Sequence, residues 1–142
     1  MRILLLNGPN LNLLGKREPE VYGTTDFQQF YEELAAVYDD VANFHYEQNN
    51  VEGELINILQ AADNDFDAVI INAGGYTHTS VAIADCIAAI STPVVEVHIS
   101  QPAAREEFRH NSLIAGKCVA SISGFGLDSY RLAVEGLLAR ED

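Results

Sequence analysis

Apolar and polar residues follow two different rhythms along the chain. Short β-branched or leucine-rich runs predict five strands, at residues 2–6, 42–48, 67–72, 93–99 and 117–123. Longer stretches carry apolar residues at helical spacing and predict helices at residues 26–40, 53–63, 79–90 and 127–141. Because strands and helices alternate, we expect right-handed crossovers and a parallel sheet that is covered on both faces.

Five parallel strands with helices on both faces favour the flavodoxin-like, doubly wound α/β fold, with strand order 2-1-3-4-5. The 142 residues suffice for one hydrophobic core, so we expect a single domain over residues 1–142. In such sheets, ligands bind beyond the carboxyl ends of the strands, near the switch in strand order. Functional side chains are therefore expected immediately after each strand.

The net charge and the composition of the chain make two classes of partner unexpected, nucleic acid and membranes. The formal net charge of -13 repels nucleic acid and anionic membranes, so neither is expected as a partner. No segment approaches the roughly 20 apolar residues that cross a bilayer.

Cys86 and Cys118 lie far apart without a C-x-x-C motif. This usage is typical of buried, reduced thiols in a cytoplasmic protein.

The long loop after the first strand, "GPNLNLLGKREPEVYGTT", places Arg17 close to Tyr22. A tyrosine that acts as a base near pH 7 needs its pKa lowered by about 3 units, roughly 4 kcal/mol. One cation about 4 Å away supplies approximately that energy at an effective dielectric constant of about 20. The alternative is that Tyr22 only packs the loop while Arg17 forms a weak surface pair with Glu18 or Glu20.

In "PVVEVHIS", Glu96 and His98 are two residues apart on a predicted strand and so face the same way. His98 lies at the carboxyl end of this strand, where a cleft is expected to open. A carboxylate beside an imidazole favours its charged, proton-donating form, which suits a general acid. The alternative is a buried Glu–His pair that is satisfied by backbone groups.

The stretch "NAGGYTHTS" begins with Asn72 at a strand end and passes through two glycines that permit a tight turn. We expect Thr77 or Thr79 to cap the following helix, with His78 at its start. Asp85, seven residues on, would then lie on the same helix face. This is either an anion or polyol site or ordinary helix capping with a solvated histidine.

In "REEFR", Arg105 and Arg109 would be neighbours on one face of a helix. They suit an anionic or hydroxylated substrate; the alternative is pairing with Glu106 or Glu107, which we expect more for Arg105 than for Arg109. The histidines and acids named above show no recognised metal spacing, so no metal is expected. The chain lacks G-x-G-x-x-G and P-loop motifs, and no cofactor is expected either.

Taken in order, six blocks of the chain resemble type II 3-dehydroquinate dehydratase, the flavodoxin-like enzyme of the shikimate and quinate pathways. They are "NGPNLNLLGKREPEVYG", "NNVEGEL", "NAGGYTHTSVAIAD", "EVHIS", "REEFRHNS" and "GFGLDSYRLA". Each block alone is a weak signal, whereas the series covers nearly the whole chain and is specific.

The resemblance implies a metal-free elimination of water from 3-dehydroquinate, through an enolate, to 3-dehydroshikimate. On the matching positions, Tyr22 is the base and Arg17 lowers its pKa. Asn10 helps to hold a water that stabilises the enolate. His98 is the general acid that protonates the departing hydroxyl, and Glu96 tunes it.

The resemblance also places the substrate carboxylate against Asn72 and the backbone of Ile99–Ser100, and the ring hydroxyls against His78 and Arg109. It implies a homododecamer built from trimers, in which Asp85 reaches a neighbouring subunit's site; nothing in the spacing shows this assembly. Residues 16–25 would form a closing lid. One local departure is Asn111, which stands where a histidine or another ring-bearing residue is expected.

Two other readings remain open at this stage. A flavodoxin-like binding module without catalysis, such as a flavin or phosphate carrier, would need a Ser/Thr-rich loop after the first strand, and "GPNLNLL" is poor in these residues. A dehydratase that works through a Schiff base would need a buried amine in an apolar pocket. Lys16 and Lys117 are the only lysines, and neither is placed in such a setting.

Overall fold

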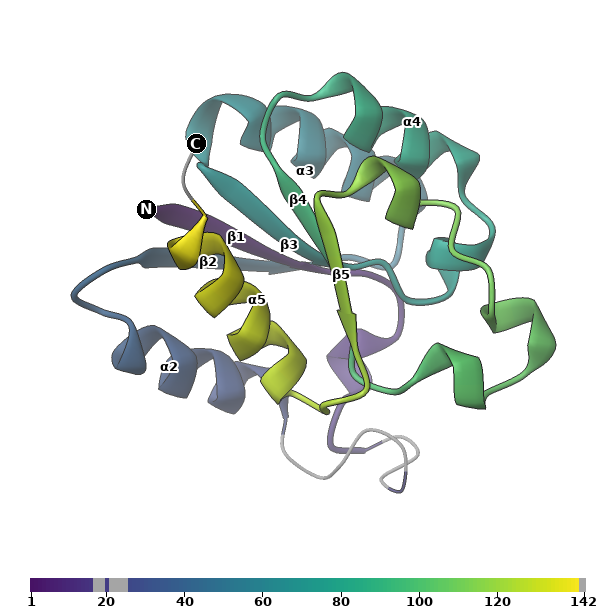
Figure 1. Ribbon diagram of the computed structural model, residues 1–142, viewed down its shortest axis with the longest axis horizontal. Helices are drawn as coiled ribbons and strands as arrows, with labels where there is room; N and C mark the ends of the chain where they lie inside the picture. The colour runs from purple at the N-terminus through teal and green to yellow at the C-terminus, as the bar shows by residue number, and fades with distance from the viewer. Residues whose placement is uncertain (17–19, 21–25, 141–142) are drawn as a thin grey trace.

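The computed structural model describes residues 1–16, Glu20 and residues 26–140. Five strands form one sheet: β1 (Arg2–Asn7), β2 (Asn43–Gln48), β3 (Ala68–Asn72), β4 (Val94–His98) and β5 (Ala120–Ser123). Every pairing is parallel, and the strand order is β2-β1-β3-β4-β5 (Figure 1). The predicted doubly wound, flavodoxin-like sheet is therefore confirmed.

Four α-helices of the described residues cover the sheet: α2 (Phe27–Val37), α3 (Glu52–Asp65), α4 (Val81–Ala89) and α5 (Asp128–Ala139). Short 3₁₀ turns follow β1, β3 and β4: η1 (Leu11–Leu13), η2 (Gly74–His78), η3 (Pro102–Ala104), η4 (Glu107–Arg109) and η5 (Ala115–Lys117). Within the described part of the chain, no helix has both the length and the apolar character to cross a membrane.

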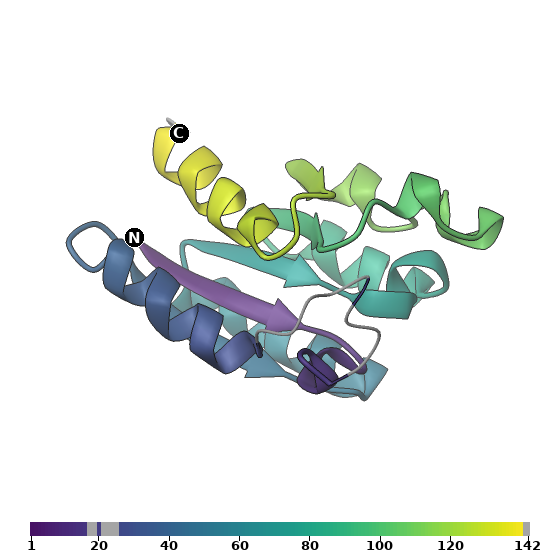
Figure 2. The same ribbon diagram turned by 90° about the horizontal axis from the view of Figure 1, so that it is seen from below.

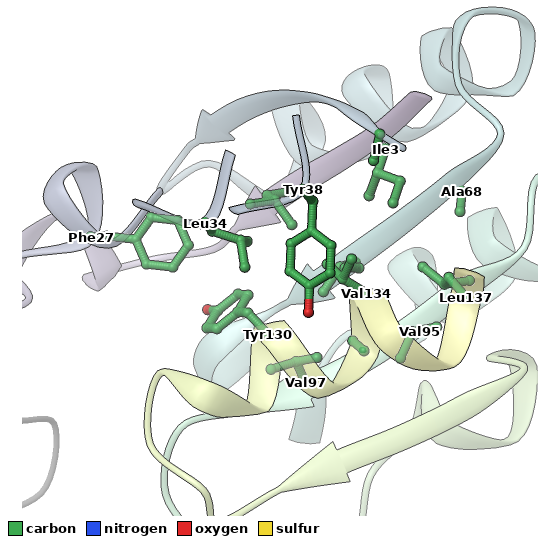
Figure 3. Packing of buried hydrophobic residues seen from close by; sticks show 14 of the residues in the cluster. Ile3, Phe27, Leu34, Tyr38, Ala68, Val95, Val97, Tyr130, Val134 and Leu137 are labelled. Atoms are coloured by element: carbon green, nitrogen blue, oxygen red, sulfur yellow. The ribbon is translucent and has the colours of Figure 1, made fainter. Parts of the chain in front are cut away.

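The core has two halves, one on each face of the sheet. Ile3 and Leu5 of β1 face α2 and α5, whereas Leu4 and Leu6 of the same strand face α3 and α4. Figure 1 shows these two helix pairs on opposite sides of the sheet, and Figure 3 shows the first half at close range. Because both faces of β1 are covered, its apolar residues run without interruption instead of alternating with polar ones.

Three local predictions were wrong. The fifth strand begins at Ala120 and not at residue 117, because residues 115–117 close the 3₁₀ turn η5. The cap of α4 is Ser80, whose hydroxyl accepts a hydrogen bond from the Ile83 N–H at 2.9 Å, and neither of the two threonines. His78 ends η2, ahead of α4, so it does not share a helix face with Asp85.

The parallel register aligns polar residues at the carboxyl ends of the strands. Asn7 of β1 lies opposite Asn72 of β3, and Glu96 of β4 lies opposite Ser121 of β5. In Figure 2 the arrow of β1, in purple, points to the end of the sheet at which η1 follows it. The loops that follow β1, β3 and β4 therefore meet at one edge of the sheet.

The loops after β1 and β3 contact each other through Gly8. Its N–H donates to the Asn72 carbonyl at 2.7 Å. A Cβ at Gly8 would lie 2.6 Å from the Ala73 carbonyl oxygen, closer than side chains tolerate. Glycine is therefore required here for the close approach of the two loops.

Gly8→Ala should lower the free energy of unfolding by about 1–3 kcal/mol, because backbone atoms must move to admit the methyl group. Chemical denaturation of the two proteins measures the difference. Gly136→Ala is the matched control: its Cβ meets no atom within 4 Å and the position is inside α5. The control should raise stability by up to about 1 kcal/mol, and equal stability of the Gly8 variant and wild type would contradict the packing argument.

Candidate active site

A cleft of about 110 Å³ opens at the carboxyl edge of the sheet, where the sequence predicted one. Seven of the predicted site residues line it: Asn10, Asn72, His78, His98, Ile99, Ser100 and Arg109. Arg105, for which the sequence left substrate binding and surface pairing open, also lines it. The other lining residues were not singled out: Pro9, Leu11, Gly74, Gly75 and Pro102. Segments from four separate parts of the chain thus form one cavity.

The cleft is locally cationic although the protein is strongly acidic. Arg105 and Arg109 line it, and no Asp or Glu belongs to its lining among the described residues. Local placement of charge can oppose the field of the whole protein. The cleft is therefore suited to an anionic or hydroxylated ligand.

At the end of β4, the His98 ring is held by a buried carboxylate. Its Nε2 lies 2.9 Å from Oε2 of Glu96, whose side chain is only 2% exposed. Ser112 and Ser121 donate to the same carboxylate at 2.6 Å and 2.7 Å. These bonds hold the carboxylate behind His98, whose ring lines the cleft.

Burial by itself would raise the pKa of Glu96. The hydrogen bonds from His98, Ser112 and Ser121, together with the charge of His98, outweigh burial and leave this pKa below its ordinary value. Glu96 consequently stays ionised at neutral pH. Burial, and then the charge of Glu96, raise the pKa of Cys118 to about 12, so this thiol stays protonated.

His78 approaches His98 from the other wall of the cleft. The two rings stack with their centroids 6.4 Å apart. The Nδ1 of His78 lies 2.9 Å from the main-chain carbonyl oxygen of Asn111. Because residue 111 makes this contact through its backbone, the asparagine at this position leaves the orientation of His78 unchanged.

The loop after β1 presents Asn10 in a left-handed conformation, with φ of 70°. Its N–H donates to Oδ1 of Asn50 at 3.0 Å, and the Gln48 side chain donates to the same oxygen. A non-glycine residue in this region is uncommon and is often found at functional sites. The polar residues after β2 therefore support the loop that lines the cleft.

Arg105 and Arg109 both reach the cleft, but not from one helix. Arg105 follows η3 in extended conformation, and Arg109 ends η4. Arg109 forms the close ion pair with Glu106, while the Nε of Arg105 is 3.9 Å from that carboxylate. At Glu106, Arg109 is therefore the closer partner, whereas the sequence favoured Arg105 for this pairing. Arg105 also donates to the Ser100 hydroxyl at 3.4 Å.

The remaining predicted site residues do not line this cleft in the described structure. Glu96 lies behind His98 and acts on the cleft through it. Asp85 is exposed on α4. Arg17 and Tyr22 lie outside the described residues, as does most of the predicted lid. Cys86 and Cys118 are both free thiols, as predicted, but only Cys86 is buried and Cys118 is half-buried.

Glu96→Gln should remove part of the pH dependence of stability. Because folding lowers the pKa of Glu96, its stabilisation is complete above the unfolded value of about 4.3 and is lost as the pH falls through the folded-state value. We expect the variant to be about 2 kcal/mol less stable than wild type at neutral pH. This difference in the free energy of unfolding between variant and wild type should narrow as the pH falls toward about 3.

Urea denaturation across this pH range measures this difference. Glu54→Gln, at an exposed position on α3, is the control and should leave the pH dependence of wild type unchanged. A difference for Glu96→Gln that stays constant with pH would show that this carboxylate is not stabilised by ionisation.

Comparison with known proteins relates the sequence of this chain to one protein family. The family model described as "Dehydroquinase class II" matches residues 1–138. A 3-dehydroquinate dehydratase from an Exiguobacterium strain is 54% identical over 138 residues, which covers 97% of this chain and 94% of the relative. One from Prochlorococcus marinus is 46% identical and covers 98% of this chain and 97% of the relative.

A solved structure agrees with the sequence relatives. The type II dehydroquinase from Butyrivibrio crossotus superposes with a TM-score of 0.94 at 39% identity, over 98% of both chains. Fold, sequence and the extent of the match thus lead to the same group of proteins. The chain belongs to the class II dehydroquinase family.

Proposed function

We propose that the protein is a hydro-lyase that converts 3-dehydroquinate into 3-dehydroshikimate, within the shikimate or quinate pathway. Family membership supports the reaction. The observation that carries the proposal is the cationic cleft, in which the buried Glu96 carboxylate holds His98. A carboxylate substrate that loses a hydroxyl needs such an anion site and such an acid.

His98 acts as the general acid. Glu96 holds its ring through Nε2, and from its place in the lining of the cleft His98 protonates the departing hydroxyl. Glu96 tunes this imidazole through the hydrogen bond between them. The two serines that donate to Glu96 keep the carboxylate in one orientation, and they thereby fix the ring of His98.

Tyr22 acts as the base, and Arg17 lowers its pKa. Both residues belong to the segment 16–25, which serves as a lid that excludes water when it closes. The support is energetic: one guanidinium about 4 Å away supplies most of the roughly 4 kcal/mol that the shift requires. Asn10 holds a water that stabilises the enolate, and its strained, exposed position at the cleft agrees with this role.

The substrate carboxylate is bound by Asn72 and by the backbone N–H groups of Ile99 and Ser100, which line one wall. The ring hydroxyls of the substrate contact His78 and Arg109, which also line the cleft. No metal or cofactor takes part in the proposed reaction. Residues 1–142 act as one catalytic domain in the cytoplasm.

The working form is a homododecamer built from trimers, in which Asp85 reaches the cleft of a neighbouring subunit. Its exposed place on α4, away from the cleft of its own chain, is compatible with that role. Closed rings of identical subunits form heterologous contacts, so one subunit's Asp85 would serve the next subunit's site.

Wild type should produce 3-dehydroshikimate from 3-dehydroquinate, and Tyr22→Phe and Arg17→Ala should each lower kcat by about 100-fold or more. The phenylalanine variant keeps the ring and removes only the basic oxygen. The ultraviolet absorbance of the conjugated product measures turnover. Lys16→Ala is the matched control for Arg17→Ala and should keep kcat within a few-fold of wild type.

Full activity of Tyr22→Phe would refute the base assignment. Borohydride added with substrate should trap no adduct, because Lys117 is exposed and neither Lys16 nor Lys117 lines the cleft. A trapped adduct would show that the reaction proceeds through a Schiff base.

Coexpression of Asp85→Ala with His98→Gln tests the shared site. Each variant alone should lose most of its kcat/KM. In mixed rings, about one quarter of the sites combine an intact His98 with an intact Asp85 from the neighbour, so activity should recover. Light scattering measures the mass of the assembly. No recovery in a confirmed mixed oligomer would place Asp85 in its own subunit's site or outside any site.

A further inference from the structure

A chain of buried hydrogen bonds connects α5 to the cleft. The Asn72 amide nitrogen donates to the Tyr130 hydroxyl at 3.0 Å, and this hydroxyl donates to Oδ1 of Asn7 at 2.7 Å. Tyr130 and Asn7 are fully buried, and Asn72 is 4% exposed. Of the three, only Asn72 lines the cleft.

Sheet register and helix packing bring these side chains together. Asn7 and Asn72 are neighbours at the carboxyl ends of β1 and β3, on the face that α5 covers. Tyr130 lies in the first turns of α5, and its ring packs against Phe27 and Phe30 with centroids 4.9 Å and 5.9 Å away. The aromatic contacts fix where the hydroxyl oxygen lies.

The direction of donation along this chain is set by a backbone group. The Gly74 N–H donates to Oδ1 of Asn72 at 3.1 Å, and an N–H can only donate. The Asn72 amide must therefore turn its nitrogen toward Tyr130. Tyr130 accepts from this nitrogen and sends its own proton to Asn7, whose Oδ1 accepts it.

This arrangement leaves one amide hydrogen of Asn72 for the cleft. A side-chain amide has two N–H donors, and Tyr130 is the only partner of this nitrogen among the described residues. Burial raises the pKa of Tyr130 far above its ordinary value, so the hydroxyl remains protonated at working pH. Donation toward Asn7 and acceptance from Asn72 thus persist together.

We propose that Tyr130, supported by Asn7, is a positioning residue that orients the Asn72 amide to donate its free hydrogen to the substrate carboxylate. The inference rests on the proposed function, because it uses Asn72 as the carboxylate ligand. Tyr130 does not touch the substrate and acts only through Asn72. The contribution is to binding, so it appears in KM and leaves kcat nearly unchanged.

Tyr130→Phe removes the hydroxyl and keeps the ring. We expect KM for 3-dehydroquinate to rise about 5-fold, as for one neutral hydrogen bond, with kcat within about 2-fold of wild type. Tyr38→Phe is the matched control: this hydroxyl also bonds a side chain, Glu135, at 2.6 Å, and its ring lies in the same cluster (Figure 3). The control should change stability but not KM.

A double-mutant cycle with Asn72→Ala tests whether Tyr130 acts through Asn72. In that background, Tyr130→Phe should have no further effect on KM, because there is no amide left to orient. An equal further rise in KM would overturn the proposal, and so would an unchanged KM in the single Tyr130→Phe variant.

Two further measurements separate the possible failures. An inactive wild type would refute the proposed function. The crystal structure of Tyr130→Phe tests the positioning independently of activity: the Asn72 amide should lose its single orientation, and an unchanged amide would overturn the inference.

If Tyr130→Phe does not fold, Asn7→Ala serves instead. It removes the acceptor of the Tyr130 proton, and it should raise KM, again without loss of kcat; an unchanged KM would overturn the inference.

Discussion

Parallel hydrogen bonding of β1, β3 and β4 brings the carboxyl ends of three strands to one edge of the sheet, and every described part of the candidate site depends on this alignment. Asn7, Asn72 and His98 end these strands. The side-chain period of two then decides which helix layer each residue meets. Asn72 faces α5 and Tyr130, whereas Glu96 and His98 face the opposite layer. One cleft is thereby served by two separate supporting networks.

Both networks place polar groups where water cannot reach them. Both oxygens of the Glu96 carboxylate have partners, whereas Nδ2 of the buried Asn7 has none among the described residues. A buried carboxylate is costly unless it is hydrogen-bonded. Glu96 receives bonds from one imidazole and two hydroxyls, from residues that are distant in the sequence except for His98. The chain from the Asn72 amide through the Tyr130 hydroxyl to the Asn7 amide is neutral. Its effect depends on the direction in which each hydrogen bond is donated, and not on charge. The first network holds the ring of His98 beside an ionised carboxylate, and the second orients the amide of Asn72.

Prediction from sequence was strongest where a single element carries the signal. Glu96 and His98 were expected to face the same way because they are two apart on a strand, and the structure shows them bonded. Prediction failed where short, irregular segments decide the outcome. The run "REEFR" contains an apparent helical pair, yet its residues 107–109 form the 3₁₀ turn η4, and Arg105 follows η3 in extended conformation. Ser121 was not singled out, because its role exists only across the β4–β5 register.

The sequence by itself determined the alternation of strands and helices, the two-sided burial of the sheet and the edge at which polar residues gather, because these follow from local periodicity and from the chirality of crossovers. The series of motifs also determined the family. Only the tertiary structure decided that Ser112 and Ser121 satisfy Glu96, that Tyr130 contacts Asn72, and that both arginines reach one cleft. The physical reason is that hydrogen bonds between residues 16 to 123 positions apart depend on register and helix packing, which no local pattern of residues encodes.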